Sequence, residues 1–274
     1  TEGTINFHDW AGDSYAINRY ASARLTTPAT ISDDSVAKLS DWPAEGRLYA
    51  AELQNNFTIA PLLDTRVVWG AQVRRDDVSS KREWLADRVT NENIILNQQG
   101  VYAQTETPLS AQLRVVLSGR YDKSTAYDAN FSPKAAILYT PVNDQTIRLT
   151  YNRAFKTPTI LNNYFSINDF VKLAAGFGGF GVFGNKEGFS VKNAAGTTLA
   201  TYQPLVPEEN TTYEVGYKGI LKDRVFIDAA YYQADYKDFI SPLVTINSHL
   251  GGTFAYDAAG QRIVSPNGAQ SVLT

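Results

Sequence analysis

The alternation of short and long connections between strand-like runs is the feature that most constrains the fold of this chain. Each short connection joins two runs in which apolar and polar residues alternate with a period of two, which is the period of a β-strand with two different faces. The stretches between these pairs are longer, in one case far longer. Tight turns at one rim and long loops at the other are typical of a membrane-spanning antiparallel β-barrel. The short connections cover residues 60–64, 107–110, 141–145 and 219–223.

Eight runs show this alternation, and in the first one Tyr49, Leu53 and Phe57 share a face from which Glu52 is excluded. None of the eight apolar faces carries Asp, Glu, Lys or Arg, whereas nearly every opposite face does. A cation facing lipid at the bilayer midplane would cost about 2 to 4 kcal/mol, so this segregation favours a barrel. A ninth, weaker run lies around residues 4–17. The eight runs cover residues 48–59, 66–74, 101–106, 113–122, 133–140, 147–152, 212–218 and 225–232.

A soluble antiparallel sandwich is the alternative fold, because it also alternates where one face packs on a core. Sandwich loops need not alternate between short and long, however, and sandwich strands rarely reach ten residues with polar side chains spaced regularly along them. The composition agrees with a barrel, since 43% of residues are hydrophobic, 19% are charged and 12% are aromatic. No apolar run is long enough for a transmembrane helix, which needs about 20 residues.

Charge and cysteine content exclude several classes of function. The net charge of −3 and the pI near 5.5 argue against a nucleic-acid partner, which normally meets a basic surface. The chain has no Cys, which removes disulfides and thiolate sites. His8 and His249 lie far apart without ligand spacing. Adjacent carboxylates such as Asp33 and Asp34 point apart in a strand or loop. We therefore expect no enzyme activity, no metal site and no cofactor.

The longest connection covers residues 152–212 and contains a Gly- and Phe-rich stretch at 174–184. Gly176, Gly178 and Gly181 match the dinucleotide fingerprint, but no strand leads into this stretch and no helix follows, so nucleotide binding is not supported. We expect a mobile loop without secondary structure. Its phenylalanines would pack on neighbouring loops or contact a ligand, and packing is the preferred interpretation. The connections at 20–44, 76–93 and 241–274 are polar and mixed in charge.

Six short motifs in a fixed order resemble the barrel of TonB-dependent outer-membrane receptors. The resemblance covers roughly residues 100–240, and the region before Gly100 fits through its strand pattern alone. The motifs are GVYAQTE at 100–106, LSGRYD at 117–122, SPKAA with YTP at 132–141, YNRAFKTP at 151–158, LVPE with YEVGYKG at 205–219, and DAAYY with YKD at 228–238.

The resemblance implies a multi-pass protein of the outer membrane, in contact with its lipid, with short periplasmic turns and long extracellular loops. Such a receptor has 22 strands and an N-terminal plug. It takes up a scarce ligand with energy from the TonB complex. A siderophore or another metal chelate is the first expectation, with cobalamin or a glycan as alternatives. A passive porin or channel is the rival function, and an adhesin or enzyme barrel is disfavoured by the missing catalytic set.

About nine strands are too few for a 22-stranded barrel, so we expect residues 1–274 to be a barrel segment without plug or TonB box. The absence of Met and of a leader likewise predicts a processed or incomplete chain. A complete small barrel is the alternative, but the residues after Ser241 lack the pattern of a closing strand. For each inward charge, a salt bridge within the wall or a contact with the plug is the alternative to ligand contact. The candidate ligand contacts are Arg120, Asp122, Asn152, Tyr164, Phe165, Phe177 and Phe180.

Overall fold

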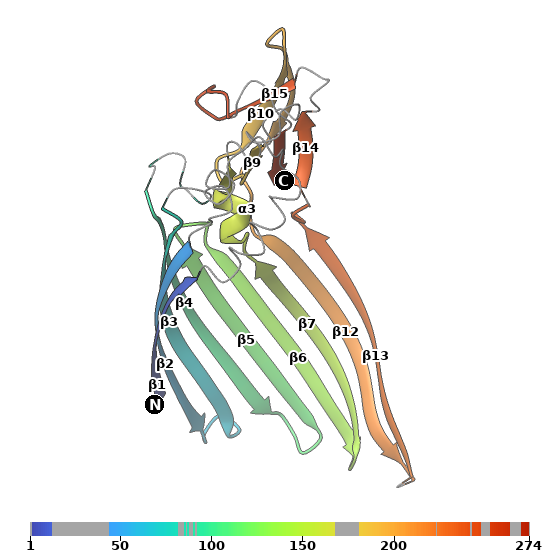
Figure 1. The fold of residues 1–274 in the computed structure, drawn as a ribbon. Coiled ribbons are helices and arrows are strands. Elements are labelled where there is room, and N and C mark those ends of the chain that lie inside the picture. The colour runs from blue at the N-terminus through green and yellow to red at the C-terminus, as the bar shows by residue number, and fades with distance from the viewer. Residues whose placement is uncertain are drawn as a thin grey trace.

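The computed structural model is dominated by one nine-stranded antiparallel sheet, which we call the wall (Figure 1). The structure describes residues 2–12, 44–81, 85, 87, 90, 92–167, 181–222, 224–241, 243–247, 253–263 and 270–273. The strands of the wall, in spatial order, are β1 (Glu2–Gly12), β2 (Ala44–Ile59), β3 (Thr65–Ser79), β4 (Ile94–Pro108), β5 (Leu113–Ser124), β6 (Asn130–Val142), β7 (Gln145–Lys156), β12 (Glu208–Leu221) and β13 (Val225–Lys237).

Every neighbouring pair in the wall is also consecutive in sequence except β7 and β12, which the longest connection separates. The strands lie side by side and are tilted, and the sheet is open, with β1 and β13 at its two edges (Figure 1). The ninth strand that the sequence predicts weakly is confirmed, since β1 pairs with β2 over its whole length. Several strands are longer than predicted, because their outer ends continue beyond the last alternating residue.

The register confirms the assignment of faces. Leu53 on β2 lies opposite Ala71 on β3, which lies opposite Val101 on β4, and Val101 lies opposite Tyr121 on β5. Side chains on this apolar face are exposed, and Val101 keeps 55% of its surface accessible. An exposed apolar band of this extent would be a liability in water but suits contact with lipid. The wall therefore has its hydrophobic side on the outside.

The short connections lie together at one rim, as the sequence predicts. They reverse the chain within a few residues, which forces some backbone into the left-handed region: φ is 51° at Asp64, 61° at Asp144 and 50° at Lys222. Asp tolerates this conformation better than most residues because its side chain can bond locally. The Thr65 hydroxyl donates to the Leu62 carbonyl oxygen and closes the first turn at 2.5 Å.

The opposite rim carries a small folded region, which we call the cap (Figure 1). It consists of two sheets, β11-β10-β15 and β14-β16-β9-β8, and one short helix. Its elements are α3 (Ile160–Tyr164), β8 (Ser166–Ile167), β9 (Gly181–Phe183), β10 (Phe189–Asn193), β11 (Thr198–Tyr202), β14 (Leu243–Asn247), β15 (Thr253–Tyr256) and β16 (Gln270–Leu273). Within the described residues, no helix has the length and apolar character needed to cross a membrane.

The cap corrects one prediction and confirms two others. The prediction that the connection 152–212 lacks secondary structure is wrong, because four short strands and α3 form within it. They form because β10 alternates and buries Phe189 and Val191 against Ala255 of β15, which is far away in sequence. Phe183 is buried, as the packing interpretation predicts. The strands after Ser241 join the cap and not the wall, so none of them closes the main sheet.

A second cluster joins the cap to the wall. Val78, Ile94 and Leu96, at the outer ends of β3 and β4, pack with Leu85 and with Tyr164 of α3. Thr159 caps the start of the helix: its hydroxyl accepts from the Asn162 amide at 3.1 Å, and the Asn162 side chain accepts from the Thr159 amide at 2.8 Å. This reciprocal pair satisfies two amides at the helix start and fixes where Tyr164 enters the cluster.

Candidate functional site

The polar face of the wall carries a hydrogen-bonded network across β2, β3 and β4. Tyr102 on β4 lies across Gly70 on β3 and reaches β2, where its hydroxyl is 2.8 Å from both Glu52 Oε1 and Gln54 Oε1. A hydroxyl has one hydrogen, so it donates to one of these oxygens at a time. A Cβ atom at Gly70 would lie 2.5 Å from the Tyr102 ring. Glycine at this position is therefore what allows Tyr102 to cross the sheet.

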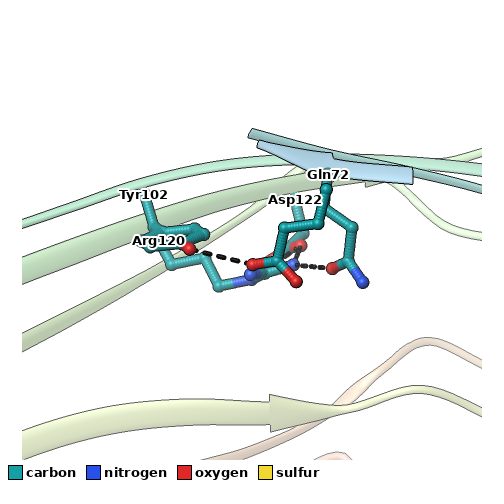
Figure 2. Close-up of polar contacts among 5 residues, drawn as sticks. Gln72, Tyr102, Arg120 and Asp122 are labelled. Atoms are coloured by element: carbon teal, nitrogen blue, oxygen red, sulfur yellow. Dashed lines mark hydrogen bonds and ion pairs between the residues drawn. The ribbon is translucent and has the colours of Figure 1, made fainter. Parts of the chain in front are cut away.

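Arg120 and Asp122 on β5 extend the network (Figure 2). The Arg120 Nε and Nη2 atoms donate to Asp122 at 2.7 to 2.9 Å, and Nη2 also donates to Gln72 Oε1 at 3.1 Å. The guanidinium carbon lies 5.7 Å from the centre of the Tyr102 ring. Gly100 makes room here in the same way, because its Cβ would lie 2.5 Å from Asp122 Oδ1. Arg120 is thus held by a carboxylate, an amide and an aromatic face.

Several other charges of the polar face are paired along or across strands. Arg74 donates to Asp76 at 2.8 and 2.9 Å, and Arg148 lies 2.6 Å from Glu214. These pairs are partly exposed, so each contributes at most about 1 kcal/mol to stability. The main effect of these ion pairs is to fix the conformation of long charged side chains on the polar face. Further pairs are Arg114 with Glu106 and Lys218 with Asp228.

A cleft of about 550 Å³ opens where the wall meets the cap. One side is the connection from β5 to β6 and the other is the connection from β11 to β12. Its size lies in the range of pockets for small molecules. Burial, followed by the nearby charge of Asp122, raises the pKa of the Tyr127 hydroxyl, which therefore remains a donor at neutral pH. The lining residues are Ser124, Thr125, Ala126, Tyr127, Asp128, Asn130, Lys186, Pro204, Leu205, Val206, Pro207, Glu209 and Asp238.

Two of the charged groups in the cleft pair with residues outside its lining. The Lys186 ammonium contacts Asp87 Oδ2 at 2.5 Å and lies 5.0 Å from the centre of the Tyr164 ring. Burial alone would lower the pKa of Lys186, but the hydrogen bond with Asp87 and the charges around it raise that pKa above its ordinary value. The Glu209 carboxylate contacts Arg153 at 2.5 Å. Asp128 and Asp238 are thus the carboxylates that give the described lining its negative character.

The structure brings some of the sequence-predicted residues together and separates others. Arg120, Asp122 and Asn152 share the polar face, and the first two form a salt bridge with each other. Tyr164 is buried in the cluster between cap and wall, and Phe165 packs against that cluster. Contact between these residues and a ligand stays a prediction. Phe177 and Phe180 lie outside the described residues.

The sequence analysis missed Tyr127, Asp128 and Lys186. Tyr127 and Asp128 follow the LSGRYD motif within a few residues, so proximity to the outer end of β5 was an available signal. Lys186 had none, because its partner Asp87 is 99 residues away in sequence. In the described part of the chain, no group of three or more His, Cys, Asp or Glu could hold a metal ion.

The comparisons with known proteins agree with this architecture. The family model described as "TonB dependent receptor-like, beta-barrel" matches residues 3–265. The chain belongs to the TonB-dependent receptor family. Receptors of this family are transporters and not enzymes. A comparison with curated proteins finds no match.

Solved structures of TonB-dependent receptors share the fold at low sequence identity. The siderophore receptor PirA from Pseudomonas aeruginosa has a TM-score of 0.58 and 15% identity, over 85% of this chain and 38% of that one. PirA from Acinetobacter baumannii has a TM-score of 0.52 and 17% identity, over 85% and 32%. A ferric enterobactin receptor, PfeA, from Pseudomonas aeruginosa has a TM-score of 0.56 and 14% identity, over 85% and 31%. The chain therefore spans about a third of the length of these receptors.

Proposed function

We propose that this chain forms part of the barrel wall and the extracellular cap of an outer-membrane receptor that imports a ferric siderophore with energy from TonB. The observation that carries the proposal is the cleft of about 550 Å³ at the cap, above a wall of the TonB-dependent receptor family. A cleft of that size accommodates a small chelate and opens where an external ligand would arrive first. The receptors PirA and PfeA, which share the fold, are siderophore receptors.

The proposed topology follows from the two rims. The short turns face the periplasm, the cap faces the exterior, and the apolar band contacts outer-membrane lipid. TonB would act through the plug domain of the complete receptor. The polar face of the wall, with the Tyr102 and Arg120 network, borders the path along which the ligand moves. Arg120, Asp122 and Asn152 remain candidate contacts on that path, with Tyr127 and Asp128 proposed at its entrance.

Charge in the cleft favours one class of chelate. Its described lining carries three carboxylates, Asp128, Glu209 and Asp238, and one ammonium, Lys186. Glu209 and Lys186 are neutralised by partners outside the lining, so the entrance is left with negative charge. A ferric complex that is neutral or positively charged would enter without repulsion, whereas a complex with several negative charges would be repelled. We therefore propose a neutral or cationic ferric chelate over a polyanionic one.

Uptake of radioactive iron tests the proposal. Cells with and without the full-length gene would receive ferric chelates that are cationic, neutral or trianionic, together with cobalamin and labelled glycans. We expect that only cells with the gene take up the cationic or neutral chelate. This uptake should stop when TonB is deleted or the proton gradient is collapsed. Equal uptake of every compound with and without the gene would overturn the proposal. Gene-dependent uptake that needs neither TonB nor a gradient would identify a passive porin.

Single substitutions separate the cleft from the rest of the protein. Asp128→Asn removes a carboxylate from the entrance, so the concentration for half-maximal uptake of a cationic chelate should rise several-fold. Asp64→Asn is the matched control, because Asp64 lies in a short turn at the opposite rim and Asn accepts its φ of 51°. A similar change in both variants, or in neither, would show that the cleft is not the entrance.

A further inference from the structure

We infer that the apolar face of the wall holds a binding groove for the phosphate head group of an anionic lipid in the outer leaflet. A groove of about 710 Å³ crosses β2, β3, β4 and β5 near their outer ends. It is distinct from the cleft at the cap and serves no step of the proposed uptake. Its lining residues form four short runs, which are Tyr49 to Ala51, Val73 to Arg75, Asn97 to Gln99 and Lys123 to Thr125.

The register shows on which face the groove lies. Its middle row is Ala50, Arg74, Gln98 and Ser124, which lie opposite one another on the four strands. Arg74 bonds to Asp76 on the polar face, so the side chains of the middle row point to that face. The adjacent polar-face residues Gln72 and Asp76 do not line the groove, so the middle row forms its floor with side chains that point away from it. The flanking rows point to the apolar face. The groove therefore runs between two rows of lipid-side residues, Tyr49-Arg75-Asn97-Thr125 and Ala51-Val73-Gln99-Lys123.

Height in the membrane follows from strand length. Arg75 is the tenth residue after Thr65, the first residue of β3, and Lys123 is the tenth after Leu113, the first of β5. Ten residues span about 33 Å along a strand, and a tilt near 45° reduces the vertical rise to about 24 Å. The apolar band of an outer-membrane barrel is about 25 Å tall. Both cations thus lie at the upper edge of that band, where lipid head groups begin.

Arg75 and Lys123 differ from most other cations of the wall in their surroundings. Among the described residues, no carboxylate lies within ion-pairing distance of Arg75 or Lys123, in contrast to Arg74 and Arg120 of the polar face. Asp77, the next outward residue on the same face of β3, lies opposite Arg47. Arg75 and Lys123 stand two strands apart and two residues apart along the strands, which is roughly 12 Å. Their long side chains can therefore converge on one phosphate group or engage the two phosphates of a larger head group.

The remaining lining suits the rest of such a lipid. Val73 and Tyr49 are exposed on the groove and continue into the apolar band below, where acyl chains would lie. Asn97 and Gln99 offer amide donors between the two cations. A tyrosine at head-group level is favourable because its ring is apolar and its hydroxyl is polar. Charge and apolar surface are thus arranged for an anionic amphiphile and not for a free anion, which would use the cations alone.

Native mass spectrometry of the full-length receptor in a neutral detergent tests this site. Phosphatidylglycerol is the anionic probe and phosphatidylcholine the zwitterionic one. We expect retained phosphatidylglycerol, and Arg75→Gln with Lys123→Gln should weaken its binding about twenty-five-fold, the product of about fivefold for each surface cation. The matched control is Arg66→Gln with Lys134→Gln, which removes two cations from the polar face and should leave lipid binding unchanged.

The outcomes separate the possible occupants. Equal retention by the wild type and the groove variant, or equal retention of both lipids, would overturn the inference. Displacement of the lipid by millimolar inorganic phosphate, or equal affinity for a dihexanoyl lipid, would assign a free-phosphate site and also overturn it. If the double variant fails to fold, the wild type alone still tests the inference. Its preference for phosphatidylglycerol over phosphatidylcholine must disappear at high salt. None of these results depends on which ligand the receptor imports.

Discussion

The wall and the cap use the same amino acids in opposite ways. In the wall, Leu117 points outward and keeps 53% of its surface exposed, while charges gather on the other face. In the cap, Phe183 and Phe189 are buried to 1% and 3% exposure, and Ala255 is fully buried. The cap follows the rule for proteins in water, and the wall requires a second, apolar solvent. An exposed leucine therefore faces lipid in the wall and water in the cap.

The two regions also differ in what holds them together. The wall is a ladder of backbone hydrogen bonds in which each strand pairs along most of its length, with one irregularity between β6 and β7. It needs no thick core, and its buried apolar residues concentrate where β3 and β4 meet the cap. The cap has strands of two to five residues and depends on two small clusters. Substitutions in the wall should therefore change stability through lipid contact and steric crowding. Substitutions in the cap should change it through packing and ion pairs.

The largest difference should come from placing a cation on each region. Leu117→Arg puts a charge in the middle of the lipid-facing band and should lower the free energy of unfolding by about 2 to 4 kcal/mol. Leu199→Arg changes a residue of the cap with nearly the same exposure, 55%, and should cost less than about 0.5 kcal/mol. Guanidinium unfolding of the full-length receptor in lipid vesicles measures both.

The same pair of variants in detergent provides a control. Detergent lets water approach the band more closely, so the penalty of Leu117→Arg should shrink while that of Leu199→Arg stays small. Equal penalties for the two arginines in vesicles would mean that the apolar face does not meet lipid.

Glycines offer the next comparison. Gly70→Ala introduces a Cβ that lies 2.5 Å from the Tyr102 ring and 2.8 Å from the Leu53 carbonyl oxygen. The backbone oxygen cannot move aside, so we expect a loss of about 1 to 3 kcal/mol. Gly196 in the cap has open space around it but a φ of +82°, so Gly196→Ala should cost about 1 kcal/mol through backbone strain alone. Unfolding in vesicles measures the first variant, and local hydrogen exchange measures the second.

Asparagine distinguishes the two causes, because it tolerates positive φ but is larger than alanine. Gly196→Asn should recover most of the stability, while Gly70→Asn should be worse than Gly70→Ala. Recovery at both positions would show that crowding by Tyr102 is not what selects glycine in the wall.

The same contrast explains what the sequence could predict. The wall was predictable because every strand repeats one local rule, and residues such as Arg120 and Asp122, two apart on one strand, must share a face. Contacts across strands were less accessible, since Tyr102 meets Glu52 through a register that the sequence does not state. The cap was not predictable, because its short strands pair across long sequence separations. Val191 and Ala255 are an example, as are Lys186 and Asp87.

Lys186→Met should loosen the cap and leave the wall unchanged. It leaves the mostly buried Asp87 carboxylate without its ammonium partner, which should lower the local stability of the cap by about 1 to 2 kcal/mol. Hydrogen exchange at the Leu85 and Asn185 amides, which bond to Ser80 and Asn162, should then accelerate about tenfold. Amides in the middle of β5 and β6 should exchange at wild-type rates.

A pH dependence of the cap should follow from the same ion pair. The pKa of folded Lys186 is raised above the ordinary value of 10.5, so its contribution is fully present at neutral pH and is lost as the pH rises through the folded pKa. Burial likewise raises the pKa of the Tyr164 hydroxyl, which adds a loss in the same direction. Exchange in the wild-type cap should approach that of Lys186→Met above about pH 10.5. A cap that loosens below neutral pH instead would contradict this.

The smallest effect should come from an ion pair of the wall. Arg148→Gln removes the partner of Glu214, but the two side chains are 43% and 26% exposed, so water can replace the lost bond. A double-mutant cycle with Glu214→Gln should give a coupling of at most about 1 kcal/mol, and 1 M salt should reduce it further. Lys186 differs because its carboxylate partner is 12% exposed. A coupling of 2 kcal/mol or more at Arg148 would mean that another part of the receptor covers this face and excludes water, which would make the two regions electrostatically alike.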